Sequence, residues 1–436
     1  MTGMAEDGGL LLPASYPQID IKKLTGLGYE DVALEVLRGY MDDMPAGDLQ
    51  TLIRKSYASF DDKSIIPLIR TRAGYFAELF HGPTYAFKDV ALQLLGNLFE
   101  YILAERRGML NIVGATSGDT GSAAIAGVRG KKGVSISILY PDGRVSAVQE
   151  RQMATVSDDN VHTYAVAGTF DDCQNIVKAL FADVEFKRAN QLGAVNSINW
   201  ARIAAQIAYY FYTYMQLPVA ISGGKINFVV PTGNFGNVFA GYVAKRMGLP
   251  IDKLVIATNK NDILHRLVQN GDYSTDDVVP THSPSMDIQV SSNLERYLFH
   301  LYGNADRLKA AMVELKDTGS ITFSKELLSK LRVDFESSSA DDSAIEETIR
   351  RIYASDKYII DPHTACGAAS VAQLHLDPEN TIILATAHPA KFGSVIEKAL
   401  NIMATEPAGI KQLAGLPTRR TKAPNEVGYF RKILSI

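Results

Sequence analysis

The chain has 436 residues, and this length predicts two or three domains rather than one core. Its 46% hydrophobic and 21% charged residues are typical of an ordinary globular protein in water. The 44 basic and 48 acidic residues give a net charge of -4 without a long basic cluster, so we expect no nucleic-acid partner.

The cysteines and the N-terminal residues indicate the cellular compartment of the protein. Cys173 and Cys366 stand in no CxxC pattern, so neither a disulfide framework nor a structural zinc site is expected. The N-terminal sequence MTGMAEDGG lacks the basic and apolar regions of a signal peptide. The stretch 203–221 is apolar but contains Gln206 and Pro218, so it predicts a buried helix rather than a membrane span. We therefore expect a cytoplasmic protein without a metal ion or a membrane partner.

Residues 1–72 are predicted to form a small N-terminal unit. The glycines at positions 8 and 9 precede three leucines and predict a turn into a short strand at 10–12. Apolar residues then recur with helical spacing over 32–40 and 49–57, which predicts two helices with buried faces. No catalytic role is expected in this part.

Short apolar runs alternate with helix-length segments from about residue 73 to residue 260. This alternation predicts right-handed crossovers and a mostly parallel sheet. Ligands of such sheets bind at the carboxyl ends of the strands. The predicted strands cover residues 75–80, 111–113, 134–139, 161–166, 226–230 and 254–257.

The pattern is looser beyond residue 260. The polar run 337–342, SSSADD, predicts a surface connection. One more strand is expected at 381–384, ending at the sequence ATAHP. The residues after about 405 show no clear pattern.

Lys88 lies at a predicted junction between a strand and a helix. The strand ends at His81-Gly82-Pro83, and helical spacing begins at Phe87. Because mainly apolar residues follow Lys88, its amine can be buried. Burial lowers the pKa of a lysine from about 10.4 and frees the amine for imine formation or proton transfer. The alternative is a lysine at a helix start that reaches into water.

The sequence PTGNFGN, residues 231–237, follows the predicted strand 226–230, and a helix is expected to start near Val238. Glycines allow backbone N–H groups to converge, and a helix N-terminus favours an anion, so this turn is suited to a phosphate. The motifs GxGxxG and GxxxxGK[ST] are absent, which argues against nicotinamide and nucleoside triphosphate sites. The alternative is a plain tight turn.

A second glycine-rich turn, GATSGDTG at 114–121, follows the predicted strand 111–113. Two such turns suggest a ligand with two anionic ends, or two anionic ligands. Asp119 is unexpected, because a carboxylate repels an anion unless it faces a cation or a proton donor. By residue type, a helix N-cap is the more usual role for it.

A lysine suited to imine formation and a phosphate-binding turn in one α/β sheet indicate pyridoxal phosphate as the cofactor. The motifs HGPTYAFKD, ATSGDTG, NSINWAR, PTGNFGN and ATAHPAKF occur in this order, and EDGGLLLP lies near the N-terminus. With them the chain resembles the bacterial and fungal threonine synthases over nearly its whole length. That resemblance implies the fold type II architecture of pyridoxal-phosphate enzymes, with mostly parallel sheets, helices on both faces and a small N-terminal α+β domain.

The resemblance also implies roles for individual residues. Lys88 would bind the cofactor as an imine, Asp119 would lie near its phenolic oxygen, and Thr386 would face its pyridine nitrogen. Arg202 would bind the substrate phosphate, with a structural salt bridge as the alternative. The cofactor phosphate would be held by Gly233, Asn234, Phe235, Gly236 and Asn237, and the substrate by Thr116, Ser117, Thr120, Asn196 and Ser197 together with Arg202. His81, His363, His388 and Lys391 lie in matching motifs with roles left open.

The implied reaction converts O-phospho-L-homoserine and water to L-threonine and phosphate, the last step of threonine biosynthesis, by β,γ-elimination and water addition. The implied domains are residues 1–72, a catalytic region at 73–405 with a mobile subdomain at about 95–210, and a tail at 406–436. We expect a monomer or a homodimer. The alternatives are a fold type II dehydratase, a phospho-lyase that yields 2-oxobutyrate, and a pyridoxal-phosphate-binding protein without activity.

Overall fold

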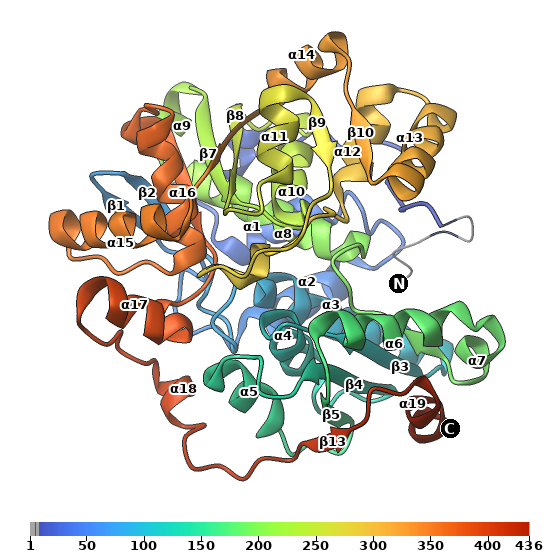
Figure 1. Ribbon diagram of the computed structural model, residues 1–436. Coiled ribbons are helices and arrows are strands. Elements are labelled where there is room, and N and C mark those ends of the chain that lie inside the picture. The colour runs from blue at the N-terminus through green and yellow to red at the C-terminus, as the bar shows by residue number, and fades with distance from the viewer. Residues whose placement is uncertain (1–4, 6–7, 436) are drawn as a thin grey trace.

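The computed structural model describes residue 5 and residues 8–435, so residues 6 and 7 of the EDGGLLLP segment lie outside the described residues. The described chain forms two α/β parts, drawn one above the other in Figure 1. Each part contains a sheet whose strands are mostly parallel, with helices packed against it. This arrangement confirms the predicted fold class.

The larger sheet has six strands in the order β1-β2-β12-β7-β8-β11. All neighbouring pairs are parallel except β1 and β2. Because β2, β12 and β7 are adjacent and parallel, the segments that follow them lie at one edge of the sheet. The strands are β1 (Leu68–Thr71), β2 (Gly74–Glu78), β7 (Ile226–Pro231), β8 (Ile251–Thr258), β11 (Phe335–Ser339) and β12 (Thr381–Ala385).

The smaller sheet has five parallel strands in the order β13-β5-β4-β3-β6. They are β3 (Leu110–Ala115), β4 (Val134–Pro141), β5 (Val161–Val166), β6 (Leu192–Gly193) and β13 (Thr421–Ala423). A separate antiparallel pair joins β9 (Asp272–Ser274) to β10 (Ser320–Thr322). All seven strands predicted from residue 73 onward are present, with bounds that differ by a few residues.

Helices surround both sheets. In the first half of the chain they are α1 (Tyr29–Leu37), α2 (Ala46–Tyr57), α3 (Lys88–Arg106), α4 (Asp119–Val128), α5 (Ala147–Ala154), α6 (Phe170–Ala182), α7 (Val184–Ala189), α8 (Trp200–Met215) and α9 (Val219–Ser222). In the second half they are α10 (Gly236–Arg246), α11 (Ile263–Asn270), α12 (Leu294–Tyr302), α13 (Ala305–Thr318), α14 (Lys325–Asp334), α15 (Asp342–Asp356), α16 (Pro362–Gln373), α17 (Gly393–Leu400), α18 (Ala408–Lys411) and α19 (Val427–Leu434). Short 3-10 helices are η1 (Ile21–Leu24), η2 (Pro284–Met286), η3 (Pro378–Asn380) and η4 (Pro389–Phe392).

The apolar stretch 203–221 contains a buried helix, as predicted. Helix α8 is almost completely buried and packs against α1, α3 and α10. It ends before Pro218, because proline cannot continue a helix interior. In the described residues, no helix combines the length and the apolar character needed to cross a membrane.

The strand predicted at 10–12 is wrong. Leu10 makes only an isolated bridge, and residues 11 and 12 are outside any strand. Side chains of helix α12 bind this backbone instead: the Leu10 N–H donates to Glu295 Oε1 at 3.0 Å, and Arg296 Nε donates to the Leu11 carbonyl at 3.0 Å.

The surface connection predicted at 337–342 is also wrong in its first half. Residues 337–339 belong to β11 in the larger sheet, and Ser337 and Ser338 are buried. Their hydroxyl groups have partners, since Ser338 Oγ donates to Ser370 Oγ and Ser337 Oγ lies 3.0 Å from His265 Nδ1. A serine-rich strand at the edge of a sheet can therefore be buried when its hydroxyl groups are hydrogen-bonded.

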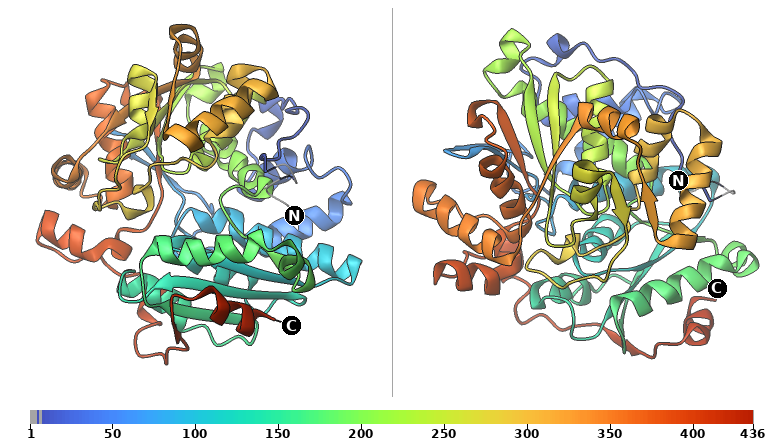
Figure 2. Two further views of the ribbon diagram at one scale, coloured as in Figure 1. Left: turned by 45° about the vertical axis from the view of Figure 1, so that its right-hand side comes forward. Right: turned by 45° about the horizontal axis from the view of Figure 1, so that its top comes forward.

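The C-terminal residues return to the smaller sheet. Strand β13 pairs in parallel with β5, and Phe430 and Leu434 of α19 join the apolar cluster that also contains residues of α6. Figure 2 shows the C-terminal helix beside the strands of this sheet. This end of the chain thus completes the smaller α/β part, although its sequence showed no clear pattern.

Candidate active site

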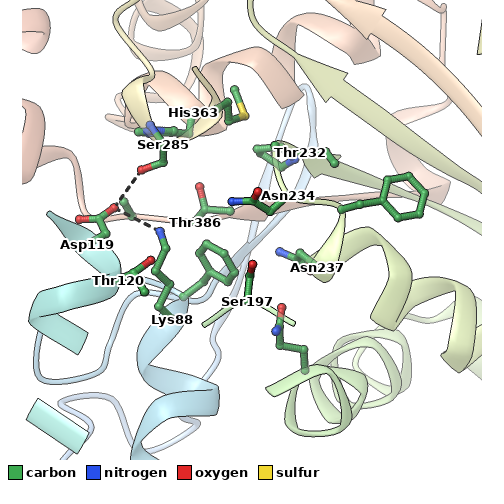
Figure 3. A pocket seen from close by; sticks show the side chains of 18 of the residues that line it. Lys88, Asp119, Thr120, Ser197, Thr232, Asn234, Asn237, Ser285, His363 and Thr386 are labelled. Carbon is green, nitrogen blue, oxygen red and sulfur yellow. Dashed lines mark hydrogen bonds and ion pairs between the residues drawn. The ribbon is translucent and has the colours of Figure 1, made fainter. Parts of the chain in front are cut away.

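One pocket contains most of the residues singled out in the sequence. It includes about 720 Å³ of space not filled by atoms, part of it open to solvent. Figure 3 shows labelled side chains from both α/β parts around this space. The wall is formed by Phe87, Lys88, Asp119, Thr120, Ser197, Arg202, Gln206, residues 231–237, Ser285, Met286, His363, Thr386 and Ala387.

Three adjacent strands explain why distant segments meet here. Lys88 follows β2, Thr386 follows β12, and the turn 231–237 follows β7. Asp119 follows β3 of the smaller sheet. The pocket therefore lies at the carboxyl ends of parallel strands, where the alternation of strands and helices places a ligand.

The turn before Lys88 is held by Asp89. Its carboxylate accepts hydrogen bonds from Thr84 N and Thr84 Oγ1, both at 2.8 Å. A Cβ atom on Gly82 would lie 2.3 Å from Asp89 Cβ, so only glycine fits against this side chain. Burial raises the pKa of Asp89 to about 6. The turn fixes Lys88 as the first residue of α3.

Lys88 lies inside the pocket, with only 11% of its side chain exposed. Its Nζ lies 3.5 Å from Asp119 Oδ2 and 4.8 Å from the centre of the Phe87 ring. Burial lowers the pKa of Lys88, the negative charge of Asp119 opposes this, and the positive charges of Lys391 and Arg202 lower it further. The lowered pKa favours the uncharged form of the amine. The alternative of a lysine that reaches into bulk water is wrong.

Asp119 is not a helix N-cap, because Gly118 holds that position in α4. The Asp119 carboxylate instead receives Lys391 Nζ at 2.7 Å, Gln149 Nε2 at 2.9 Å and Ser285 Oγ at 3.4 Å. Burial alone would raise the pKa of Asp119, but the charges of Lys391 and Lys88 overcome it and hold the pKa well below its usual range. The carboxylate faces two cations, which is the condition under which it is tolerated at this turn.

The turn 231–237 lies against the segment 291–293. Ser291 Oγ donates to the carbonyl of Gly233, and the Asn293 backbone N–H and Nδ2 donate to the carbonyl of Asn234 at 3.1 and 3.0 Å. Helix α10 begins at Gly236, slightly earlier than predicted, and the first N–H groups of a helix have no partner inside it. The carbonyl groups are thus bound on one side, and the N–H groups at the start of the helix can bind an anion.

Asn237 adds a side-chain donor to this turn. Its Oδ1 accepts hydrogen bonds from the hydroxyl groups of Tyr209 and Tyr210, which fixes the orientation of the amide. Its Nδ2 is buried and has no hydrogen-bond partner among the described residues. A buried donor without a partner is costly, so this atom fits an oxygen of a bound phosphate.

Arg202 is a second buried donor without a partner. It is 4% exposed, and its Nε and Nη1 are buried without hydrogen bonds among the described residues. No carboxylate of the described chain pairs with it, and burial lowers its pKa to about 10. The alternative of a structural salt bridge is therefore wrong. An anionic ligand in the pocket would satisfy this guanidinium.

The second glycine-rich turn binds its own polar groups. Thr116 Oγ1 accepts hydrogen bonds from the N–H groups of Gly118 at 3.0 Å and Gly121 at 2.8 Å. Thr116 is buried outside the pocket wall, Ser117 is exposed, and Thr120 lies in the wall. The structure thus brings one of these three predicted substrate residues to the pocket.

The segment 196–202 divides in a similar way. Ser197, Arg202 and also Gln206 line the pocket, whereas Asn196 lies outside its wall. Ser197 Oγ lies 3.0 Å from Ser292 Oγ. Ser197 and Arg202 can therefore reach a ligand in this conformation.

The histidines with open roles occupy different places. His363 lies in the pocket wall; its Nδ1 donates to Asp361 at 2.9 Å, and its Nε2 accepts from the N–H of Ser285 at 3.1 Å. His388 lies outside the wall and caps η4, and burial lowers its pKa to about 4. His81, also outside it, contacts Asp61 and Glu78 at 2.7 Å each; burial lowers its pKa, but the two carboxylates raise it above the usual value.

The sequence reasoning missed Ser285, Met286 and the segment 291–296. Arg296 is 1% exposed and donates to the carbonyls of Leu11 and Ile198 and to Asn293 Oδ1. Asn293 in turn holds the turn at Asn234. No glycine-rich or nucleophile motif marks these residues, and an arginine in a helical pattern gives no local signal of burial.

Comparisons with known proteins found similar sequences and structures. The profile of pyridoxal-phosphate dependent enzymes matches residues 74–341, the threonine synthase N terminus matches 1–57, and the threonine synthase C-terminal profile matches 364–433. The chain is 47% identical to the threonine synthase of Saccharomyces cerevisiae, over 92% of this chain and 85% of the yeast protein. It is 42% identical to that of Pseudomonas aeruginosa, over 100% and 94%. The crystal structure of pyridoxal-phosphate-bound threonine synthase from Brucella melitensis superposes with a TM-score of 0.96 at 44% identity, covering 99% of this chain and 94% of that chain.

Proposed function

This chain belongs to the threonine synthase family, and we propose that its lysine-centred pocket converts O-phospho-L-homoserine and water to L-threonine and phosphate. The enzyme is a pyridoxal-phosphate-dependent lyase. The observation that carries the assignment of residues is the pair of buried donors without partners among the described residues, Asn237 Nδ2 and the Arg202 guanidinium, in the pocket that holds Lys88. Each would donate to an oxygen of a phosphate group.

The residues present fit the cofactor. Lys88 would bind its aldehyde carbon, and Asn237 with the N–H groups of the turn 233–237 would hold its phosphate. Thr386 would face the pyridine nitrogen, where a neutral hydroxyl leaves this nitrogen largely unprotonated. When bound, pyridoxal phosphate draws electrons from the substrate carbon that loses its proton.

Lys88 would then move protons. When it is not bound to the cofactor, the Lys88 amine would lie in a pocket whose burial and positive neighbours lower its pKa. An uncharged amine can accept the proton of the substrate α carbon, which an ammonium cannot. Asp119 beside it would bind the ammonium form after the transfer, at the 3.5 Å separation observed.

Arg202 and Ser197 would bind the phosphate that leaves. A guanidinium donates charged hydrogen bonds to a phosphate, and Nε and Nη1 of Arg202 are buried without partners among the described residues. Because both phosphate sites lie in one wall of the pocket, cofactor and substrate would be held in register during elimination.

Closure of the subdomain at about 95–210 would complete the site. Ser117 and Asn196, which resemblance places on the substrate, lie outside the pocket wall in the present conformation. Moving this part of the chain toward the larger sheet would bring both residues and Thr120 onto the substrate and limit the entry of water. Such closure commonly completes active sites and controls which water reacts.

The product assay tests this function. Purified protein with pyridoxal phosphate and O-phospho-L-homoserine should release L-threonine and inorganic phosphate in equal amounts. A phospho-lyase would release phosphate together with 2-oxobutyrate, and a cofactor carrier would release neither. Either of these outcomes would contradict the proposal.

A cytoplasmic location and a monomeric or homodimeric state are also proposed. Cys173 and Cys366 are both free and buried, which suits a reducing compartment. Light scattering on the eluate of a size-exclusion column would determine the oligomeric state.

A further inference from the structure

Two lysines share one buried carboxylate at the pocket. Lys391 Nζ lies 2.7 Å from Asp119 Oδ1, and Lys88 Nζ lies 3.5 Å from Asp119 Oδ2. The residues come from η4, α4 and the start of α3, which no local sequence pattern connects. Lys391 is outside the pocket wall and has no part in the reaction described so far.

Lys391 is built into its position. Its side chain has no exposed surface, and its ammonium also donates to the carbonyl of Thr84 at 2.8 Å. That carbonyl belongs to the turn that orients Lys88 and also accepts from Gln152. Gln149 donates to the same Asp119 oxygen as Lys391. The carboxylate and the Lys391 ammonium thus form a close pair with fixed partners.

One carboxylate can neutralise one ammonium. If both lysines were protonated, the buried group of three would carry a net positive charge, and burying an uncompensated charge is expensive. The closer pair is Lys391 with Asp119, so the proton is lost most easily from Lys88. Without Lys391, the whole carboxylate charge would act on Lys88 and keep it protonated.

We propose that Lys391 is a positioning residue that takes up the charge of Asp119 and thereby leaves Lys88 free to be an uncharged nucleophile. The charged groups that face Lys88 are Asp119 from α4, Lys391 from η4 and Arg202 from α8. His363 from α16 lines the same pocket, with its Nδ1 bound to Asp361. Of these, Lys391 and Arg202 disfavour the ammonium form of Lys88, and Asp119 favours it.

The inference rests on Lys88 being the cofactor lysine, and the test uses the rate at which pyridoxal phosphate forms an imine with the apoprotein. This rate is followed by absorbance between pH 6 and pH 10, and borohydride reduction with peptide mapping identifies the modified lysine. Lys391→Met and Lys391→Gln remove the positive charge, and the glutamine can still donate to the Thr84 carbonyl.

Both variants should move the midpoint of the rate profile about 1 to 3 pH units higher, because an opposite charge at this distance raises the pKa of an amine by that amount. On the acidic side of the profile, the reaction should become about tenfold slower for every pH unit by which the midpoint rises.

A second substitution separates charge from packing. Asp119→Asn combined with Lys391→Met removes both charges, so the midpoint should return to within about half a pH unit of the wild-type value. If the Lys391 variants acted only by disturbing the packing, the double variant would shift the midpoint as much as the single variants or more. Lys391→Arg should keep the wild-type midpoint. Lys398→Met is the matched control, since Lys398 is 62% exposed and pairs with Glu346 away from the pocket.

The outcomes are distinct. An unchanged or lower midpoint in both Lys391 variants, with Lys88 as the trapped residue, would overturn the inference while leaving the proposed function intact. A double variant whose midpoint stays high would also overturn it. Trapping of another lysine in the wild type would overturn the assignment of Lys88 itself, and this inference with it.

Discussion

The two glycine-rich turns at the pocket look alike in sequence but differ in how their polar groups are used. The turn 231–237 has its carbonyls bound by residues 291–293, while Asn237 Nδ2 has no partner among the described residues. The turn 114–121 binds two of its own N–H groups through Thr116 and carries Asp119, whose carboxylate faces two lysines. The turn 231–237 thus has a free donor that can bind an anion, whereas the turn 114–121 positions a charged side chain beside Lys88.

This difference indicates that two similar glycine-rich turns can differ in their capacity to bind a phosphate. What decides is whether the turn already contains an acceptor for its N–H groups. The Thr116 hydroxyl is such an acceptor, and in the first turn the Thr232 hydroxyl is directed elsewhere because it donates to the carbonyl of Val230 at 2.6 Å. Substitutions around the two turns can therefore test their separate roles.

The largest effect is expected from Lys88, which lies between the two turns. Lys88→Ala should reduce turnover by at least the roughly 10²- to 10⁴-fold that one acid–base group supplies, because nucleophile and base are lost together. The absorbance of the lysine-bound cofactor should disappear. Thermal unfolding should remain cooperative, since the truncation opens no large cavity in a core. A variant that forms threonine at about a tenth of the wild-type rate would contradict the assignment of Lys88.

Arg202→Ala tests whether the phosphate sites are separate. The loss of a charged hydrogen bond, roughly 1.5 to 3 kcal/mol, should lower kcat/KM about ten- to a hundredfold. The affinity for pyridoxal phosphate should not change, because the cofactor phosphate is assigned to the turn 233–237. Steady-state kinetics and cofactor titration measure the two quantities.

Arg202→Lys is the control for this prediction. It keeps the charge but loses the planar pair of donors, so it should restore activity only in part, and inhibition by free phosphate should weaken in both variants. If Arg202→Ala lost the cofactor and still bound substrate analogues, the two phosphate sites would have to be exchanged.

The place of Lys88 and of the first turn could be predicted from sequence because the signals are local. A strand end, a turn with Gly82 and a helix start are adjacent in the chain, and so are the glycines after β7. The parallel sheets follow from the alternation of strands and helices, which each segment shows on its own.

The surroundings of Asp119 could not be predicted in this way. Its partner Lys391 is far along the chain, and a local rule favours the N-cap for an aspartate after glycine. The burial of Ser337 and Ser338 depends likewise on hydroxyl partners in other segments. Local propensity fails at these places because long-range hydrogen bonds and ion pairs decide the result.

Gly118→Ala should destabilise the protein, because Gly118 lies in the glycine-rich turn 114–121. Gly118 has φ 133°, which side chains rarely adopt, and a Cβ atom there would lie 2.3 Å from Gln149 Cδ. The free energy of unfolding should fall by about 1 to 3 kcal/mol, in denaturant titrations. Gly143→Ala is the control, since Gly143 also has a positive φ, 69°, but has open space around it. An equal loss in both variants would show that contact with Gln149 contributes nothing.

The smallest effect is expected from a tyrosine that supports the first turn. The Tyr210 hydroxyl lies 2.8 Å from the Asn237 carbonyl and 2.9 Å from Asn237 Oδ1, and Tyr209 also donates to this Oδ1. Tyr210→Phe therefore removes one of two supports. A neutral hydrogen bond contributes about 0.5 to 1.5 kcal/mol, so the dissociation constant of pyridoxal phosphate should rise about two- to tenfold. Cofactor titration followed by absorbance would measure it.

Tyr214→Phe is the matched control for this change, because Tyr214 is in the same helix α8 and donates to the carbonyl of Gly224, outside the pocket. It should leave cofactor affinity unchanged. At saturating cofactor, kcat/KM of Tyr210→Phe should stay within about twofold of the wild-type value, since the proposal assigns the substrate phosphate to Arg202 and Ser197. A larger loss in kcat/KM than in cofactor affinity would mean that Asn237 serves the substrate, and the distinction between a cofactor turn and a positioning turn would have to be redrawn.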